Sequence, residues 1–176
     1  MGHTFEPTEI ALRNGRTVRV RAILPSDEEE LLQAFDRFSP AARYMRFMAP
    51  RREVDVPRLR NLLATLPERG LAIAATIPAP DGIDIVGTAS FMLDAEPGRC
   101  EFAISIVDDW AGAGLGRALL TALIDAARRR GLVEMHGFVL ADNRAMLKLA
   151  ERVGFKIRTD PQDFSVRVCT LDLASP

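Results

Sequence analysis

The central part of the chain changes its hydrophobic period in a way that leaves few folds open. Three strand-like runs, at 71–77, 83–93 and 99–107, are joined by the short turns "PAPDG" and "AEPG", and short turns between consecutive strands indicate antiparallel hairpins. A helical apolar stripe follows from Leu115 to Ala126, and then the strand-like run "VEMHGFVL". Because a strand–helix–strand crossover joins parallel neighbours, this segment predicts one parallel pair in a mostly antiparallel sheet.

Start signals place further elements on both sides of this segment. The run "TVRVRAI" alternates like a strand, Ser26 with Glu29 marks a helix start, and Ser39 before Pro40 marks another. The remaining expected elements are a helix over 55–66, a helix capped by Asn143 and a last strand over 164–173. The sequence therefore predicts one α/β (α+β) domain over 1–176, with a mixed, mostly antiparallel twisted sheet of six or seven strands and helices on both faces. Residues 1–16 are expected to be a peripheral or partly flexible segment.

Composition argues against several classes of function. Of the 23 basic residues 21 are arginine, but the net charge is −1 and aromatic residues make up 6%, which argues against a nucleic-acid-binding face. The longest uncharged apolar stretch, 71–77, is too short to span a membrane, and the start "MGHTFEPTEI" lacks a leader pattern. We therefore expect a cytoplasmic protein, either a monomer or a homodimer.

Cysteine and histidine residues are too few to indicate a disulfide framework or a metal site. Cys100 and Cys169 are the only cysteines, and we expect both to be reduced. His3 and His136 have no cysteine or histidine neighbours at ligand spacing, so no metal is expected.

The stretch "DDWAGAGLGRALL" places three glycines at alternate positions just before a helix. A nucleotide P-loop needs Gly-Lys-Ser/Thr, but Gly116 is followed by Arg117 and Ala118, and Arg117 also breaks the dinucleotide pattern G-x-G-x-x-G. Free N–H groups at the positive end of a helix would still favour a phosphate. The alternative is a tight turn that binds nothing, but such a turn does not require three glycines, so a ligand-binding loop is favoured.

Three runs make the comparison with a known family specific. They are "EFAISIVDDWAGAGLGRALLTALIDAARRRGL", "MHGFVL" and "DNRAMLKLAERVGF", and in residue type, order and spacing they resemble the GNAT superfamily of acyl-CoA-dependent N-acetyltransferases. The resemblance covers roughly residues 17–173 and is strongest over 101–155. The run "SPAARYMRF" is also similar to the first helices of the acetyltransferase domain of bacterial protein lysine acetyltransferases.

The resemblance implies that acetyl-CoA is the co-substrate. In that family the glycine-rich turn holds the CoA pyrophosphate through backbone amides, the strand before it presents the acetyl group, and the asparagine that opens the next helix contacts the pantetheine. The implied cofactor-binding residues are Ile106, Val107, Asp108, Ala111, Gly112, Ala113, Gly114, Leu115, Gly116, Arg117 and Asn143.

Three alanines depart from the family pattern. Members often have a polar side chain where Ala111 and Ala113 stand, but a phosphate held by main-chain donors would be bound more weakly rather than lost. Many members also have a tyrosine, which protonates the leaving thiolate, at the position of Ala150. A thiol with a pKa of about 8.5 leaves at neutral pH without much help, so the reaction can proceed without this acid.

Glu101 is the candidate general base, since an amine with a pKa of about 10.4 is mostly protonated at pH 7. It lies on the strand before the glycine turn, and the alternation of strand side chains places it on one face with Ala103, Ser105 and Val107. Partial burial there would strengthen its affinity for a proton. The alternative is an exposed partner for an arginine. A main-chain N–H around Val107 is the expected donor to the thioester carbonyl.

The predicted function is transfer of an acetyl group from acetyl-CoA to a primary amine, which is either a protein lysine or a small molecule. A non-catalytic module that binds acyl-CoA is the alternative, and a nucleotide-binding protein is a remoter one. Three other residues are interpreted as structural: Trp110 as a packing residue, Tyr44 as part of an amphipathic helix and His136 as a strand residue. Either of two roles is open to Arg144, Lys148 and Arg152, which are exposed helix charges or contacts of the adenosine phosphates.

Overall fold

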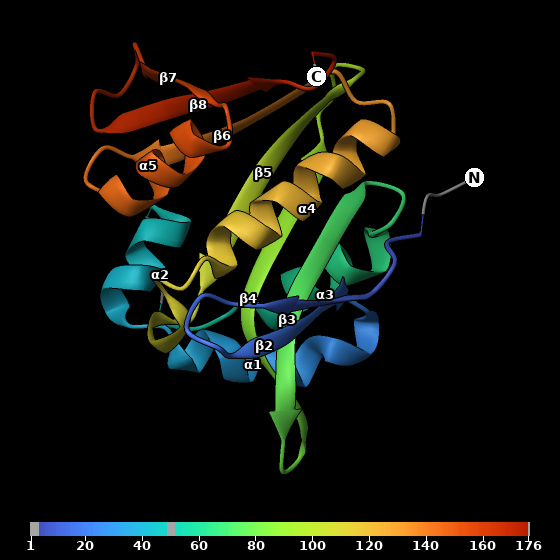
Figure 1. The fold of residues 1–176 in the computed structure, drawn as a ribbon. Coiled ribbons are helices and arrows are strands. Elements are labelled where there is room, and N and C mark those ends of the chain that lie inside the picture. Colours follow the sequence, from blue (N-terminus) through green and yellow to red (C-terminus); the bar gives the residue numbers. More distant parts are fainter. Residues whose placement is uncertain (1–3, 49–51, 176) are drawn as a thin grey trace.

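The structure is a computed structural model that describes residues 4–48 and 52–175. Its helices pack on one sheet of eight strands (Figure 1). The strands are β1 Thr8–Ala11, β2 Thr17–Ala22, β3 Gly70–Ala79, β4 Gly82–Leu93, β5 Arg99–Ile106, β6 Glu134–Leu140, β7 Lys156–Thr159 and β8 Val166–Asp172. The helices are α1 Glu28–Arg37, α2 Pro40–Phe47, α3 Val56–Thr65, α4 Leu115–Arg129 and α5 Arg144–Arg152, with 3-10 turns η1 Pro25–Asp27 and η2 Asp108–Trp110.

The strand order is β1-β2-β3-β4-β5-β6-β8-β7, and only β5 and β6 are parallel neighbours. This confirms the predicted fold class and the parallel pair around α4. The sheet has two strands that were not predicted, β1 and β7. Each has four residues, which is too few for a strand period to stand out from the surrounding sequence.

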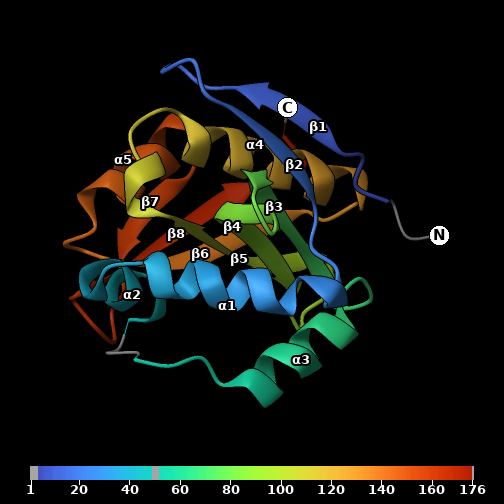
Figure 2. The ribbon, with the colours of Figure 1, turned by 90° about the horizontal axis from the view of Figure 1, so that it is seen from below.

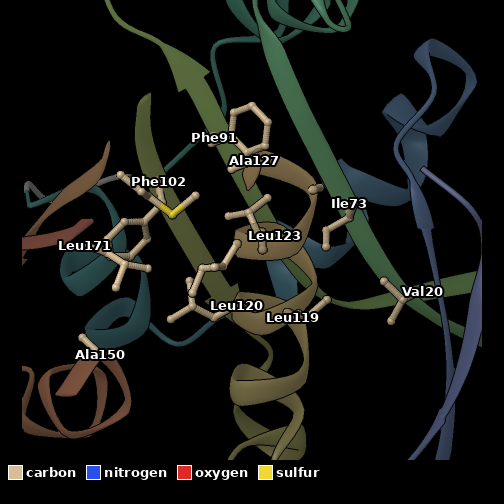
Figure 3. Close-up of a cluster of buried hydrophobic side chains, with 14 of the residues drawn as sticks. Val20, Ile73, Phe91, Phe102, Leu119, Leu120, Leu123, Ala127, Ala150 and Leu171 are labelled. Carbon is tan, nitrogen blue, oxygen red and sulfur yellow. The ribbon is translucent and has the colours of Figure 1, made fainter. Parts of the chain in front are cut away.

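Helices cover both faces of the sheet, as predicted (Figure 2). On one face α1 packs against the sheet through a small cluster of Ala34, Ala74 and Ile85. On the other face α4 buries an almost continuous stripe of its own side chains, among them Leu119 and Leu123 (Figure 3). The larger core therefore lies on the α4 side, where it keeps the start of this helix in a fixed position relative to β5.

The first helix begins later than predicted. Ser26 was expected to cap it, but Ser26 lies inside the 3-10 turn η1, and α1 starts at Glu28. The Asp27 carboxylate causes the difference, because it accepts two hydrogen bonds of 2.8 Å from Arg21 and one of 2.8 Å from the Leu24 amide. The caps predicted at Ser39 and Asn143 are confirmed by hydrogen bonds of 3.1 and 3.2 Å to main-chain amides.

Strands β5 and β6 separate shortly after they meet. Their pairing covers three positions and ends at Glu101 opposite His136, although β5 continues to Ile106 and β6 to Leu140. Just past the last pair, the Phe102 ring lies over Gly137, where a β-carbon would come within 2.4 Å of a ring carbon. The aromatic ring of Phe102 also packs on Phe155 at a centroid distance of 4.9 Å. A glycine at 137 is therefore required where the strands diverge.

We expect Gly137→Ala to destabilise the protein by about 1–3 kcal/mol, because the added methyl group overpacks the Phe102 ring. This would lower the melting temperature by roughly 2–4 °C per kcal/mol, measured by circular dichroism. The same substitution in a Phe102→Leu background should be less destabilising, because the smaller side chain vacates the space. Equal losses in both backgrounds would show that the ring does not determine the effect.

Candidate active site

A cleft of about 1210 Å³ opens where β5 and β6 separate. It is lined by residues 101–106 of β5, the glycine-rich turn before α4, the first turns of α4 and α5, and α2. Figure 2 shows α2 on one side of the sheet and α4 with α5 on the other, so the cleft is bordered by helices from both layers. Glu101, Gly112 and Asn143 all contribute to its wall.

The glycine-rich turn presents a row of unpaired donors to this cleft. Within the described part of the chain, no acceptor is in hydrogen-bonding geometry with the N–H groups of residues 112–117. The first main-chain bond of α4 runs from Ala118 to the Gly114 carbonyl, 3.1 Å away. The positive end of a 15-residue helix adds to these donors. Such a group of amides binds an anion, and phosphate is the typical one.

The N-terminal hairpin holds the glycine-rich turn from outside. Arg13 donates from its amide to the Ala113 carbonyl and from its guanidinium to the Gly112 carbonyl, both at 3.2 Å. Arg16 donates to the Asp109 carbonyl at 3.1 Å and stacks over the Trp110 ring at 4.2 Å. Residues 8–16 therefore include the edge strand β1 and two arginines that orient the turn. These contacts were not predicted, because they join residues about a hundred positions apart.

Most of the predicted cofactor-binding positions line the cleft. These positions are Ile106, Ala111, Gly112, Ala113, Gly114, Gly116, Arg117 and Asn143. Val107, Asp108 and Leu115 lie outside its lining. Leu115 is buried in the core on the side of α4 that faces Gly87, and Asp108 is exposed in the η2 turn.

The Val107 amide is not available to a ligand, contrary to the expectation that it could polarise the thioester carbonyl. It donates to the Val86 carbonyl on β4 at 2.9 Å. Because N–H groups along a strand point to alternate sides, the amide of the preceding residue, Ile106, points away from β4 and toward the open edge of β5. Ile106 lines the cleft, so its amide replaces that of Val107 as the candidate donor.

Glu101 lines the cleft but is exposed, so the expectation of a partly buried carboxylate is wrong. The helix above this part of β5 is α2, which has no buried residue and leaves the carboxylate open to solvent. No basic nitrogen of the described residues lies within 4.0 Å of it. Arg46 of α2 is close enough to interact with its charge. The alternative interpretation expected Glu101 to pair with an arginine. The arginine that interacts with its charge is Arg46 on a helix, and the two side chains do not form an ion pair.

The residues considered as further acids or ligands fall mostly outside the cleft. Ala150 is completely buried, so its position supplies no proton donor. Tyr44, the only tyrosine of the chain, is 45% exposed and does not line the cleft. Arg144 and Lys148 are exposed on α5 outside the cleft, whereas Arg152 contributes to its wall.

The contribution of α2 to the site was not predicted from the sequence. Met45, Arg46, Phe47 and Met48, at the end of this helix, line the cleft. The apolar side chains of an amphipathic helix usually face the core, and α2 has only eight residues. Only the packing shows that these side chains face a cavity.

Both cysteines are reduced and buried, on β5 and β8. Burial raises the pKa of Cys100 to about 12, with a further contribution from the charge of Asp94, and burial raises the pKa of Cys169 to about 11. Neither thiol is a nucleophile near neutral pH. Across residues 4–48 and 52–175, no three histidine, cysteine or acidic side chains are grouped closely enough to hold a metal ion. No helix in these ranges has the length and apolar character needed to cross a membrane.

Comparison with known proteins assigns this fold and cleft to a family. The acetyltransferase (GNAT) domain profile matches residues 17–156, and the chain belongs to the GNAT acetyltransferase family. Members transfer an acetyl group from acetyl-CoA, so acetyl-CoA is the co-substrate of this protein.

The chain is similar over most of its length to bacterial acetyltransferases. It is 35% identical to acetyltransferase PA5475 of Pseudomonas aeruginosa over 153 residues, which is 87% of this chain and 82% of the relative. It is 30% identical to acetyltransferase Pat of Mycolicibacterium smegmatis over 84% of this chain, but spans only 44% of that longer protein.

Solved structures show the same architecture. The GNAT domain of S. lividans PAT has a TM-score of 0.85 and 25% sequence identity, covering 94% of this chain and 96% of that domain. An acetyltransferase of Salmonella typhimurium, solved with its cofactor acetyl-CoA, has a TM-score of 0.70 and covers 89% of this chain and 94% of its own. Its 22% identity shows a shared fold.

We expect both thiols of the folded protein to resist labelling by Ellman's reagent at pH 8. Because burial raises both pKa values above their ordinary value of 9.0, the thiolate fraction falls below that of a free cysteine. Two thiols should react rapidly once the protein is unfolded in guanidinium chloride. Stability should fall as the pH rises above 9, since the unfolded thiols ionise first. Rapid labelling of the folded protein would contradict this description of the core.

Proposed function

We propose that this protein transfers an acetyl group from acetyl-CoA to a primary amine, with Glu101 as the general base. The main support is that two features open on one cleft. Unpaired amides at residues 112–117 lie at the start of α4, and an exposed carboxylate lies on the strand that leads to them. Acetyl transfer from a CoA thioester requires a site for the cofactor's phosphates and a group that accepts the proton of the amine, and the turn and the carboxylate are suited to these two roles.

The amides of the glycine-rich turn fit the CoA pyrophosphate. A β-carbon at Gly112 would meet no atom within 4 Å, so the main chain there is open to a ligand. The pantetheine arm would then follow the edge of β5 that β6 leaves unpaired, where the main-chain groups of Ile104 and Ile106 point outward. Asn143 uses its carbonyl oxygen to cap α5, which leaves its side-chain amide free to donate to the cofactor.

The transfer itself is a direct attack. The ammonium form of the acceptor loses a proton to Glu101, directly or through water, and the neutral nitrogen attacks the thioester carbonyl carbon. In this proposal the Ile106 amide, whose residue lines the cleft, stabilises the negative charge that forms on the carbonyl oxygen. The carbon–sulfur bond breaks, the amide product forms, and Glu101 returns its proton to solvent.

The leaving thiolate does not need a side-chain acid. Its conjugate thiol has a pKa of about 8.5, so the thiolate is a good leaving group at neutral pH and takes a proton from water. This agrees with alanine at 150, where many family members have tyrosine. A protein lysine and a small-molecule amine can both take the acceptor role in this step. A non-catalytic acyl-CoA-binding module remains the competing function, and measurement of CoA release separates the two.

We expect Glu101→Gln to lower kcat by roughly 10²–10⁴-fold, because a general base contributes about that much. The dissociation constant for acetyl-CoA should stay within about twofold, since the cofactor is held by main-chain groups elsewhere in the cleft. Thiol release and isothermal titration calorimetry measure the two quantities. Glu9→Gln, on the exposed edge strand β1, is the matched control and should change neither. An unchanged kcat in Glu101→Gln would remove this residue from the base role.

A second pair of variants tests the glycine-rich turn. Gly112 and Gly131 both have φ of +81°, and at neither would a β-carbon meet another atom within 4 Å. Alanine at either position should therefore destabilise the protein by a similar amount, about 1–2 kcal/mol. Only Gly112→Ala should weaken acetyl-CoA binding, by roughly tenfold, because its methyl group crowds the anion. Equal affinities of the two variants would place the cofactor elsewhere.

A further inference from the structure

Among the arginines that line the cleft in the described part of the chain, Arg46 on α2 is the only one that is not exposed. It is half-buried and lines the cleft. Within the described residues its guanidinium makes no hydrogen bond and no ion pair, and it stacks over the neighbouring Phe47 ring at 5.0 Å. Burial lowers its pKa from the ordinary value, and the charge of Glu101 opposes this shift. A partly desolvated cation with unused donors is unfavourable unless a ligand supplies the anion.

Arg43, another arginine of α2, differs from Arg46 because its guanidinium has hydrogen-bond partners. Arg43 donates from its guanidinium to the Phe35 carbonyl at 3.2 Å and to the Asp36 carbonyl at 3.3 Å, and stacks over the Phe35 ring. Its role in joining α2 to α1 is structural. Arg46, three positions later, faces the cleft instead and joins nothing together. Its position is therefore not explained by stabilisation of the fold.

The phosphates of the cofactor do not supply the anion for Arg46, because Arg46 and the phosphate-binding amides lie at opposite ends of β5. Arg46 interacts with Glu101 near the start of the strand, whereas the phosphate-binding amides follow its end. From Glu101 to Ile106 a strand spans about 16 Å. The thioester carries no charge, so the anion must belong to the acceptor.

Glu101 and Arg46 together indicate which charged groups the acceptor has. Their charges interact, but no nitrogen of Arg46 comes within 4.0 Å of the Glu101 carboxylate. Both side chains line the cleft, so a molecule bound there can direct its ammonium group toward Glu101 and an anionic group toward Arg46. A carboxylate matches the planar guanidinium best, since it can accept two parallel hydrogen bonds. An α-amino acid carries this pair of charges on one carbon atom.

The surroundings of Arg46 define the rest of the molecule. The cleft has an apolar part of its wall, to which α2 and the residue before it contribute Phe38, Met45, Phe47 and Met48. We propose that the acceptor is a free α-amino acid with an apolar side chain, whose carboxylate is bound by Arg46. This inference rests on the proposed acetyl transfer with Glu101 as base. The product is the N-acetyl amino acid, formed as the carbon–nitrogen bond replaces the carbon–sulfur bond, with CoA released as the free thiol.

The test compares acceptors that differ only at the carboxyl group. L-leucine, L-methionine and L-phenylalanine are each paired with their amides, and CoA release is measured at saturating acetyl-CoA. The wild type should have a kcat/KM for each acid at least about tenfold above that for its amide. Arg46→Met should lower kcat/KM for the acids at least about tenfold and leave the amides within about threefold. Arg19→Met removes an arginine of β2 that does not line the cleft, and should change neither.

Several results would overturn the assignment of Arg46. These are equal or better activity of the wild type with the amides, an equal effect of Arg46→Met on both acceptor types, and weaker acetyl-CoA binding in Arg46→Met. A peptide with a blocked N-terminus and one lysine separates this proposal from the general one. Acetylation of that peptide but of no free amino acid would overturn the acceptor class and leave acetyl transfer intact. Binding of acetyl-CoA without CoA release for any acceptor would overturn the proposed function itself.

Discussion

The separation of β5 from β6 is the constraint on which the candidate site depends. Three paired positions hold the two strands together, and beyond them the Phe102 ring occupies the space over Gly137. The remaining edge of β5 then has main-chain groups without a neighbouring strand, which a sheet interior normally does not tolerate. An open edge of this kind provides hydrogen bonds for an extended ligand. It also leaves room for α2 to approach the strand from the opposite layer.

The second requirement is a turn whose amides are fixed before any ligand arrives. The core side of α4 sets the position of its first turn, and Arg13 and Arg16 hold the preceding residues through main-chain carbonyls. Because these contacts use the carbonyl groups, the N–H groups remain available. A turn held in this way loses less conformational entropy when it binds an anion than a free glycine-rich loop would. The departures at Ala111 and Ala113 are therefore compatible with binding through the main chain alone.

Much of the fold could be predicted because its elements have strong local signals. The apolar stripe of α4, the cap at Asn143 and the alternation of β3, β4 and β5 are properties of neighbouring residues. The predictions were wrong or incomplete where contacts between distant residues determine an element. Asp27 shifts the start of α1 because it pairs with Arg21 of β2, and β1 becomes a strand only because β2 offers it an edge.

The site divides in the same way. The sequence by itself determined the glycine-rich turn, its place before a long helix, and Glu101 on the strand that leads to it, since all of these lie within one continuous segment. Only the tertiary structure decided that the Val107 amide is used by Val86, that Glu101 is exposed, and that Arg46 faces it across the cleft. The reason is physical: hydrogen-bond partners, burial and the approach of two charges depend on how layers far apart in the chain pack, and local spacing carries no information about that packing.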